Sequence, residues 1–155
     1  MCFVDLQKAY DTVDRTLLWQ VLTRIGVSPQ MIAVIQQFHD GLRACVRPNG
    51  LCLDWFEVEQ GLRQGCVLSP LLFNIFFAAV LNVVLQRFSE KPAILAELVH
   101  LKEPSTSMGP EPAMDYVRRA VWGMLYADDA CIVSRSPQGL AKMMKVIVEI
   151  AEHSR

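Results

Sequence analysis

Two adjacent aspartates, Asp128 and Asp129, lie between two apolar stretches, residues 121–125 and 130–133. This pattern predicts a β-hairpin with both carboxylates at its turn. Two like charges at the tip of a hydrophobic hairpin are unfavourable unless a cation meets them. Mg²⁺ is the natural candidate, because it prefers carboxylate oxygens and fills its remaining positions with water and phosphates. The plain alternative is a solvated turn, which is how most Asp-Asp pairs are used.

A third aspartate, Asp5, stands at the end of the apolar run that begins with Phe3-Val4. Aspartate is depleted in strands, and a buried carboxylate must be neutralised or find a cation. Asp5 could therefore belong to the same metal site, or it could simply cap the turn after a strand. Tyr10 follows five positions later.

A loop bracketed by glycines precedes the most apolar part of the chain. In residues 61–65, two glycines flank Arg63 and Gln64. Glycine allows the backbone to approach a ligand closely. Ser69 and Pro70 then form a helix start, with serine as the N-cap and proline in the first turn. The alternative is an ordinary glycine-containing loop ahead of a buried helix.

Together these segments resemble motifs A, B and C of the palm of a reverse transcriptase, in their usual order. Motif A corresponds to residues 3–14 (FVDLQKAYDTVD), motif B to residues 61–74, and motif C to residues 126–129 (YADD). The amino-acid sequences of motifs A and B are similar to those of the non-LTR (LINE-type) retrotransposon group. A maturase of the group II intron type or a telomerase-type enzyme is an alternative, which the sequence RQGC at residues 63–66 disfavours.

The resemblance implies an RNA-directed DNA polymerase that transfers nucleotides to a primer 3′-OH by two-metal chemistry. Asp5, Asp128 and Asp129 would be its catalytic residues and would hold two Mg²⁺ (or Mn²⁺) ions. Its partners would be an RNA template, a DNA primer and a dNTP. No membrane partner is expected.

The resemblance also implies a nucleotide-binding group. Tyr10 matches a residue whose ring crowds the sugar 2′ side and selects deoxynucleotides; otherwise it is a half-buried core tyrosine. Gln64 and Gly65 match residues that contact the incoming nucleotide and the template. Arg63 could meet a phosphate or be a solvated loop charge. Tyr126 is expected near the primer end.

The elements that must position these residues alternate between strands and helices. We expect a strand over residues 2–6 and then a helix that Thr12 or Asp14 caps and Gly26 ends. Asp11 and Asp14 are interpreted as acids at this helix start, with metal ligands as the alternative. The apolar stripe comprises Leu17, Leu18, Val21, Leu22 and Ile25. Ser28-Pro29 starts a second helix, whose apolar side comprises Ile32, Ile35, Phe38 and Leu42.

Further along, Pro48-Asn49-Gly50 predicts a hairpin between residues 43–48 and 51–58. A long buried helix should run from Ser69 to about residue 87, and its apolar part, residues 71–85, is too short to span a bilayer. Residues 89–119 are interpreted as an insertion, with a short helix over residues 93–102 and a mobile loop. Ser136-Pro137 caps a last helix, whose inward residues are Leu140, Met143, Met144, Ile147 and Ala151.

These elements predict an α+β fold, with helices packed on one face of a small antiparallel sheet. The resemblance adds that this is a polymerase palm-like sheet, with the acids of motifs A and C on adjacent strands. Residues 1–155 are interpreted as one domain, a palm fragment that lacks fingers and thumb. We therefore expect the isolated chain to be inactive. The alternative is a catalytically dead retroelement relic, or a domain co-opted for nucleic-acid or protein interaction.

Charge and composition agree with a fragment. The chain has 15 Lys and Arg against 16 Asp and Glu, a net charge of −1, whereas nucleic-acid affinity depends mainly on cationic contacts. Hydrophobic residues make up 52% and the mean hydropathy is +0.26, which suggests apolar surface meant for neighbours. Five cysteines without a CxxC pair or secretory signal predict free thiols in a reducing compartment. We expect an intracellular protein, cytoplasmic or nuclear, that is not secreted.

Overall fold

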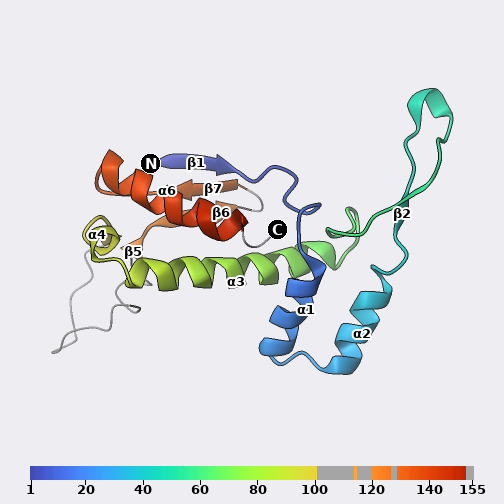
Figure 1. The fold of residues 1–155 in the computed structure, drawn as a ribbon, viewed down its shortest axis with the longest axis horizontal. Coiled ribbons are helices and arrows are strands. Elements are labelled where there is room, and N and C mark those ends of the chain that lie inside the picture. Colours follow the sequence, from blue (N-terminus) through green and yellow to red (C-terminus); the bar gives the residue numbers. More distant parts are fainter. Residues whose placement is uncertain (101–113, 115–119, 127–128, 153–155) are drawn as a thin grey trace. The chain divides into compact units, whose positions relative to one another are not determined.

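The computed structural model describes residues 1–100, 114, 120–126 and 129–152. The chain divides into two compact units, and each is described by itself. The first unit combines Met1–Gln7 with the chain from Phe77 onward, and the second is Lys8–Phe76. Figure 1 shows the elements of both units.

A three-stranded antiparallel sheet forms the centre of the first unit. It consists of β1 (Cys2–Asp5), β6 (Gly123–Tyr126) and β7 (Asp129–Ile132), in the order β1-β7-β6. The predicted hairpin is therefore confirmed, with β6 and β7 as its arms. The first strand of the chain lies beside the last one (Figure 1), so segments far apart in the sequence meet in one sheet.

Two helices cover one face of this sheet. Helix α6 (Pro137–Glu152) begins where expected, since the Ser136 hydroxyl accepts a hydrogen bond from the Gly139 backbone N–H at 3.0 Å. It packs with the later part of α3 (Ser69–Ser89). The buried cluster comprises Val84, Phe88, Ile94, Leu98, Ala120, Ile132, Met143 and Val146. Val4 packs against this cluster, whereas the neighbouring Phe3 is 80% exposed. The α+β prediction is thus confirmed at this level.

The segment after α3 differs from its prediction. Helix α4 spans only Pro92–Leu95, and Val99–His100 forms β4, which pairs with β5 (Ala120–Val121). The expected helix over residues 93–102 is therefore wrong. Pairing with a distant strand decides the conformation of Val99–His100, and the local sequence does not reveal that partner. The predicted mobile loop lies mostly outside the described residues.

The second unit begins with two capped helices that match their predictions closely. Asp14 caps α1 (Arg15–Arg24) by accepting from the Leu17 N–H at 3.0 Å. Ser28 caps α2 (Pro29–Gln37) by accepting from the Met31 N–H at 3.3 Å. The apolar sides are predicted less well: Leu18, Leu22, Ile32 and Ile35 are buried, but Ile25 and Phe38 are exposed. His39 is buried in place of Phe38, with 1% of its surface exposed.

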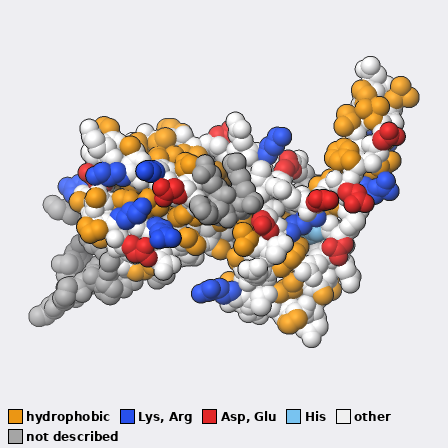
Figure 2. Space-filling view, in the orientation of Figure 1, with side chains coloured by type: hydrophobic (Ala, Val, Ile, Leu, Met, Phe, Trp, Pro, Cys, Tyr) orange, Lys and Arg blue, Asp and Glu red, His pale blue; other side chains and the backbone are white. Residues whose placement is uncertain are grey.

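A hairpin follows α2. Strands β2 (Arg43–Ala44) and β3 (Phe56–Glu57) pair around a short helical turn, η1 (Pro48–Gly50), which confirms the hairpin but with much shorter strands. Cys45 and Cys52 form a disulfide within it. The prediction of five free thiols is therefore wrong, because the turn brings two cysteines seven residues apart face to face; Cys2, Cys66 and Cys131 are free. Exposed apolar side chains cover this hairpin (Figure 2), as composition suggested.

Helix α3 is longer than its apolar segment. Its 21 residues span about 31 Å at 1.5 Å per residue, so by length and composition it could cross a bilayer. The prediction that residues 71–85 are too short to span is therefore wrong for the whole helix. Core helices of soluble proteins can be equally long and apolar. Five apolar residues of α3 are buried: Leu72, Phe73, Phe76, Val84 and Phe88. Leu71 and Val83 are exposed, so the helix is buried only in part.

Candidate active site

The first part of the candidate site is the pairing of Asp5 with Asp129. The register of β1 against β7 places these two residues directly opposite each other, and Tyr126 of β6 is opposite Asp129 on its other side. Residues directly opposite in an antiparallel pair are the closest cross-strand neighbours. The structure therefore brings the acid of motif A beside the second acid of motif C. Asp128 and the turn at residues 127–128 lie outside the described residues.

Alternation along β1 places Asp5 on the face of the sheet away from α3 and α6. Phe3 and Asp5 are exposed, whereas Cys2 and Val4 are half-buried, and Val4 packs on the helix side. Asp5 is thus open to a ligand. Among the described residues there is no group of three or more His, Cys, Asp or Glu side chains that could hold a metal. The backbone register sets two aspartates opposite each other, and aspartate is a residue type whose carboxylate oxygens Mg²⁺ prefers.

The second part of the candidate site lies in the second unit, where the turn after motif A is tied to the motif B loop. The Leu62 N–H donates to the Tyr10 carbonyl at 2.8 Å, and the Gly61 N–H donates to the Val13 carbonyl at 3.0 Å. Gly61 has φ +81°, and a Cβ there would lie 2.6 Å from the Asp11 carbonyl oxygen. Only glycine allows the two backbones to come this close.

A side-chain hydrogen bond reinforces this junction. The Gln64 amide Nε2 donates to Asp11 Oδ1 at 2.9 Å. The interpretation of Asp11 as a helix-start acid is therefore wrong, because α1 begins later and Asp14 caps it. Asp11 instead holds the amide of a predicted nucleotide-binding residue. Its position in sequence gave no sign of this, since the contact joins residues 53 positions apart.

Tyr10 stacks on Phe73 of α3. The ring centroids are 4.8 Å apart and the planes are inclined by 18°, an offset-stacked geometry that favours a fixed ring orientation. Tyr10 is half-buried, which is compatible with both predicted roles. A ring held in this way can present a defined edge to a bound molecule.

Arg15 is a site-supporting residue that sequence reasoning missed. Its guanidinium donates to three carbonyls: Nε to Gly61 at 2.7 Å, Nη1 to His39 at 3.1 Å and Nη2 to Gln60 at 3.3 Å. Partial burial lowers the pKa of Arg15, and the charge of Asp40 opposes this shift. The sequence did contain a signal for this role. A cation in the first turn of a helix is unfavourable, so an arginine there indicates that other contacts stabilise it.

The remaining loop residues hold the backbone of motif B. The buried Ser69 hydroxyl donates to the Arg63 carbonyl at 2.6 Å. Helix α3 starts at Ser69 itself, so the prediction that Ser69 is the N-cap is wrong. The Arg63 side chain and Gly65 are exposed, and Gly65 has φ +78°. A hydrogen bond from the backbone of Leu68 is the main cause of the lowered pKa of the Cys66 thiol, and the Arg63 charge adds to it.

Comparison with known families gives the class of protein. A family model for reverse transcriptase (RNA-dependent DNA polymerase) matches residues 1–155, so the chain belongs to the reverse transcriptase family.

Among known proteins, the chain is 35% identical over 82 residues to the RNA-directed DNA polymerase from mobile element jockey of Drosophila funebris. It is 25% identical over 140 residues to the Pol polyprotein from the type-1 retrotransposable element R2 of Nasonia vitripennis. The matches cover 52% and 90% of this chain but only 9% and 11% of those proteins. These relatives confirm the predicted placement in the non-LTR retrotransposon group.

Proposed function

We propose that this chain is the palm of an RNA-directed DNA polymerase, which extends a DNA primer on an RNA template. The single observation that carries the proposal is the register that sets Asp5 opposite Asp129 on neighbouring strands. Membership of the reverse transcriptase family supplies the reaction class.

Asp5, Asp128 and Asp129 would hold Mg²⁺ or Mn²⁺. Such ions, when bound, lower the pKa of an attacking hydroxyl and offset charge on the leaving pyrophosphate. The chain's own contribution would be to bring Asp5 and Asp129 opposite each other on neighbouring strands, with Asp128 next to Asp129 in the sequence. Like charges so placed repel one another, so the arrangement favours cation binding.

The junction of Tyr10, Asp11 and Gln64 would form the nucleotide side. Asp11 already holds the Gln64 side chain by a hydrogen bond. The Gln64 amide therefore need not be ordered when a nucleotide binds, which lowers the entropic cost of binding. The stacked ring of Tyr10 would exclude a 2′-hydroxyl and so favour deoxynucleotides. Arg63, exposed beside them, is available to a phosphate.

The test is primer extension on an RNA template by the longer polypeptide that contains this chain. Asp5→Ala and Asp128→Ala should each abolish synthesis, because each removes a proposed metal ligand. Asp54→Ala is the matched control, since Asp54 is an exposed aspartate of the β2–β3 hairpin and is not one of the proposed site residues. Extension that survives Asp5→Ala contradicts the proposal. A polypeptide that binds Mn²⁺ but never extends a primer supports the relic alternative.

A further inference from the structure

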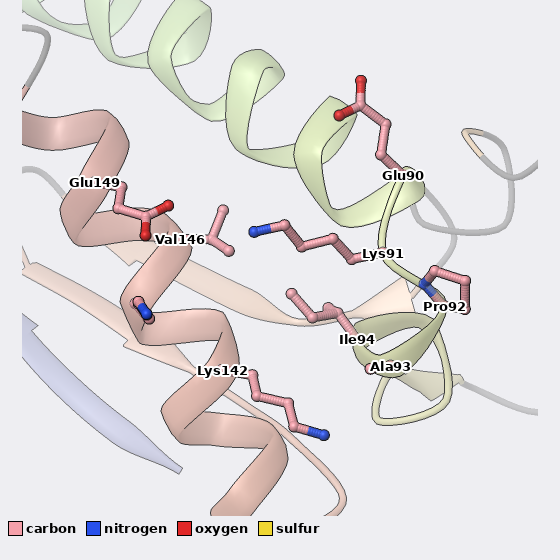
Figure 3. A pocket seen from close by; sticks show the side chains of 9 residues that line it. Glu90, Lys91, Pro92, Ala93, Ile94, Lys142, Val146 and Glu149 are labelled. Atoms are coloured by element: carbon pink, nitrogen blue, oxygen red, sulfur yellow. The ribbon is translucent and has the colours of Figure 1, made fainter.

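An open pocket of about 430 Å³ lies in the first unit, between the end of α3, helix α4 and helix α6 (Figure 3). Its apolar floor includes the buried side chains of Ile94 and Val146. Its rim carries five charged residues: Glu90, Lys91, Lys142, Lys145 and Glu149. Cavities of this size are typical of ligand sites.

Lysines are concentrated here to an unusual degree. The chain has five lysines in all, and three of them, Lys91, Lys142 and Lys145, line this one pocket. Lys91 extends from the α3–α4 link toward α6, and Lys142 projects from α6 (Figure 3). Figure 2 shows several Lys and Arg side chains over the same part of the first unit, with Asp and Glu side chains among them.

None of these three lysines forms an ion pair with another described residue. Within the described part of the chain, the one salt bridge joins Arg87 to Glu90 at 3.5 Å, so Glu90, one of the two acids on the rim, already has a cation. Lys142 and Lys145 are three residues apart on one helix, a spacing at which like charges repel. The pocket thus gathers positive charge in a chain whose net charge is −1.

The pocket is separate from the candidate active site. The residues that line it belong to α4, α6 and the end of α3, and α3 and α6 pack on the Val4 side of the sheet. Asp5 is on the other face. An anion in the pocket would therefore not contact the paired aspartates.

The side chains around the pocket indicate which anion fits. Lysine ammonium groups act as point charges for phosphate oxygens. Of the side chains that the structure describes, no aromatic ring lines the pocket, so bases cannot stack there. The apolar residues of the pocket are also too small to hold the large side chains that anchor a peptide in a groove. We propose that this pocket binds the phosphodiester backbone of a single nucleic-acid strand, independently of base sequence, as a second contact outside the catalytic face.

The experiment measures binding of the chain to a fluorescein-labelled oligodeoxythymidylate, by anisotropy over a series of KCl concentrations without divalent ions. The triple variant Lys91→Gln, Lys142→Gln, Lys145→Gln should weaken binding. The slope of log K against log salt should fall by about 2, since each lost contact with a single strand removes about 0.7. Because no catalysis is involved, the outcome is independent of the polymerase proposal.

A charge-matched control separates a site from a general charge effect. The variant Arg24→Gln, Arg43→Gln, Arg47→Gln removes three exposed charges elsewhere and should leave the slope nearly unchanged. An equal loss in this control would overturn the proposal. Tighter binding of a glutamate-rich peptide than of the oligonucleotide at the same salt would also overturn it.

A second variant tests the same pocket in the opposite direction. Glu149→Gln removes a negative charge from the rim and should strengthen oligonucleotide binding. Binding that weakens or stays unchanged would contradict the assignment. Circular dichroism of every variant confirms that the fold is retained.

Discussion

Gln64 donates a hydrogen bond to Asp11 at 2.9 Å and so joins the motif B loop to the turn that follows motif A. The backbone bonds of Gly61 and Leu62 run alongside it. These contacts form one junction, whose energetics can be tested without any catalytic assay.

Asp11→Leu should lower the free energy of unfolding by about 1 kcal/mol, because it removes the acceptor for Gln64. Asp11→Asn keeps an acceptor oxygen and should cost less. Thermal unfolding of both variants measures the difference, and a double-mutant cycle with Gln64→Leu isolates the pair. Asp54→Leu, on the exposed hairpin, is the control. Strict additivity of Asp11→Leu and Gln64→Leu would show that the hydrogen bond contributes nothing.

Gly61→Ala should destabilise the chain by about 3 kcal/mol, because its new Cβ would meet the Asp11 carbonyl oxygen while its backbone stays in the left-handed region. Gly65→Ala is the matched comparison. Gly65 also has a positive φ, but no described atom lies within 4 Å of the position that a Cβ would take there. It should cost about 1 kcal/mol. Similar midpoints of denaturation for the two variants would contradict the close approach at Gly61.

Mg²⁺ or Mn²⁺ should raise the melting temperature of the chain, since the ions would bind only the folded arrangement of acids. Asp128→Asn should remove most of this gain, and so should Asp5→Asn. Differential scanning fluorimetry with and without each ion provides the measurement, and Asp54→Asn should behave like the unmodified chain. An unaltered ion response in Asp128→Asn would place the ions elsewhere.

Tyr10→Ala should leave DNA synthesis intact in the longer polypeptide and admit ribonucleotides, because it opens space beside the sugar 2′ position. Phe73→Leu should have a weaker effect in the same direction, since it removes the ring on which Tyr10 stacks. Primer extension with ribonucleotides and deoxynucleotides in competition measures both. Unchanged sugar preference in Tyr10→Ala would assign that residue to the core alone.

Cys66 should react with iodoacetamide at lower pH than the same cysteine in a short peptide of residues 63–69. The backbone hydrogen bond from Leu68 stabilises the thiolate and lowers the pKa of Cys66, so the reactive form persists further down in pH. Mass spectrometry of alkylation against pH locates the midpoint. The buried Cys131 should stay slow at every pH. Equal midpoints in chain and peptide would show that the folded loop has no such effect.

Local signals in the sequence predicted the helix starts well. Asp14 and Ser28 cap their helices because a capping oxygen acts within three residues of its own position. The strand that carries Asp5 and the hairpin of Asp129 were also predictable from apolar runs that end in acids. Predicting that these strands are neighbours required the family resemblance, since hydrophobic periodicity does not indicate which strands pair.

Most of the mispredicted features depend on distant partners. Val99–His100 forms a strand because it meets β5, and Cys45 finds Cys52 because a turn folds back. Asp11 pairs with a glutamine on another loop, which helix-start statistics cannot anticipate. Phe38 is exposed although it was expected on the apolar side of the second helix, because α2 ends at Gln37 and the helical periodicity does not continue beyond it.

The pairing of β1 with β7 also has a consequence for biosynthesis. Residues 2–5 leave the ribosome well before their partners, residues 129–132. Such long-range pairing is slow, because a large loop must close before any contact forms. The nascent chain must therefore keep an unpaired strand with an exposed Phe3 out of intermolecular sheets until synthesis has passed residue 132.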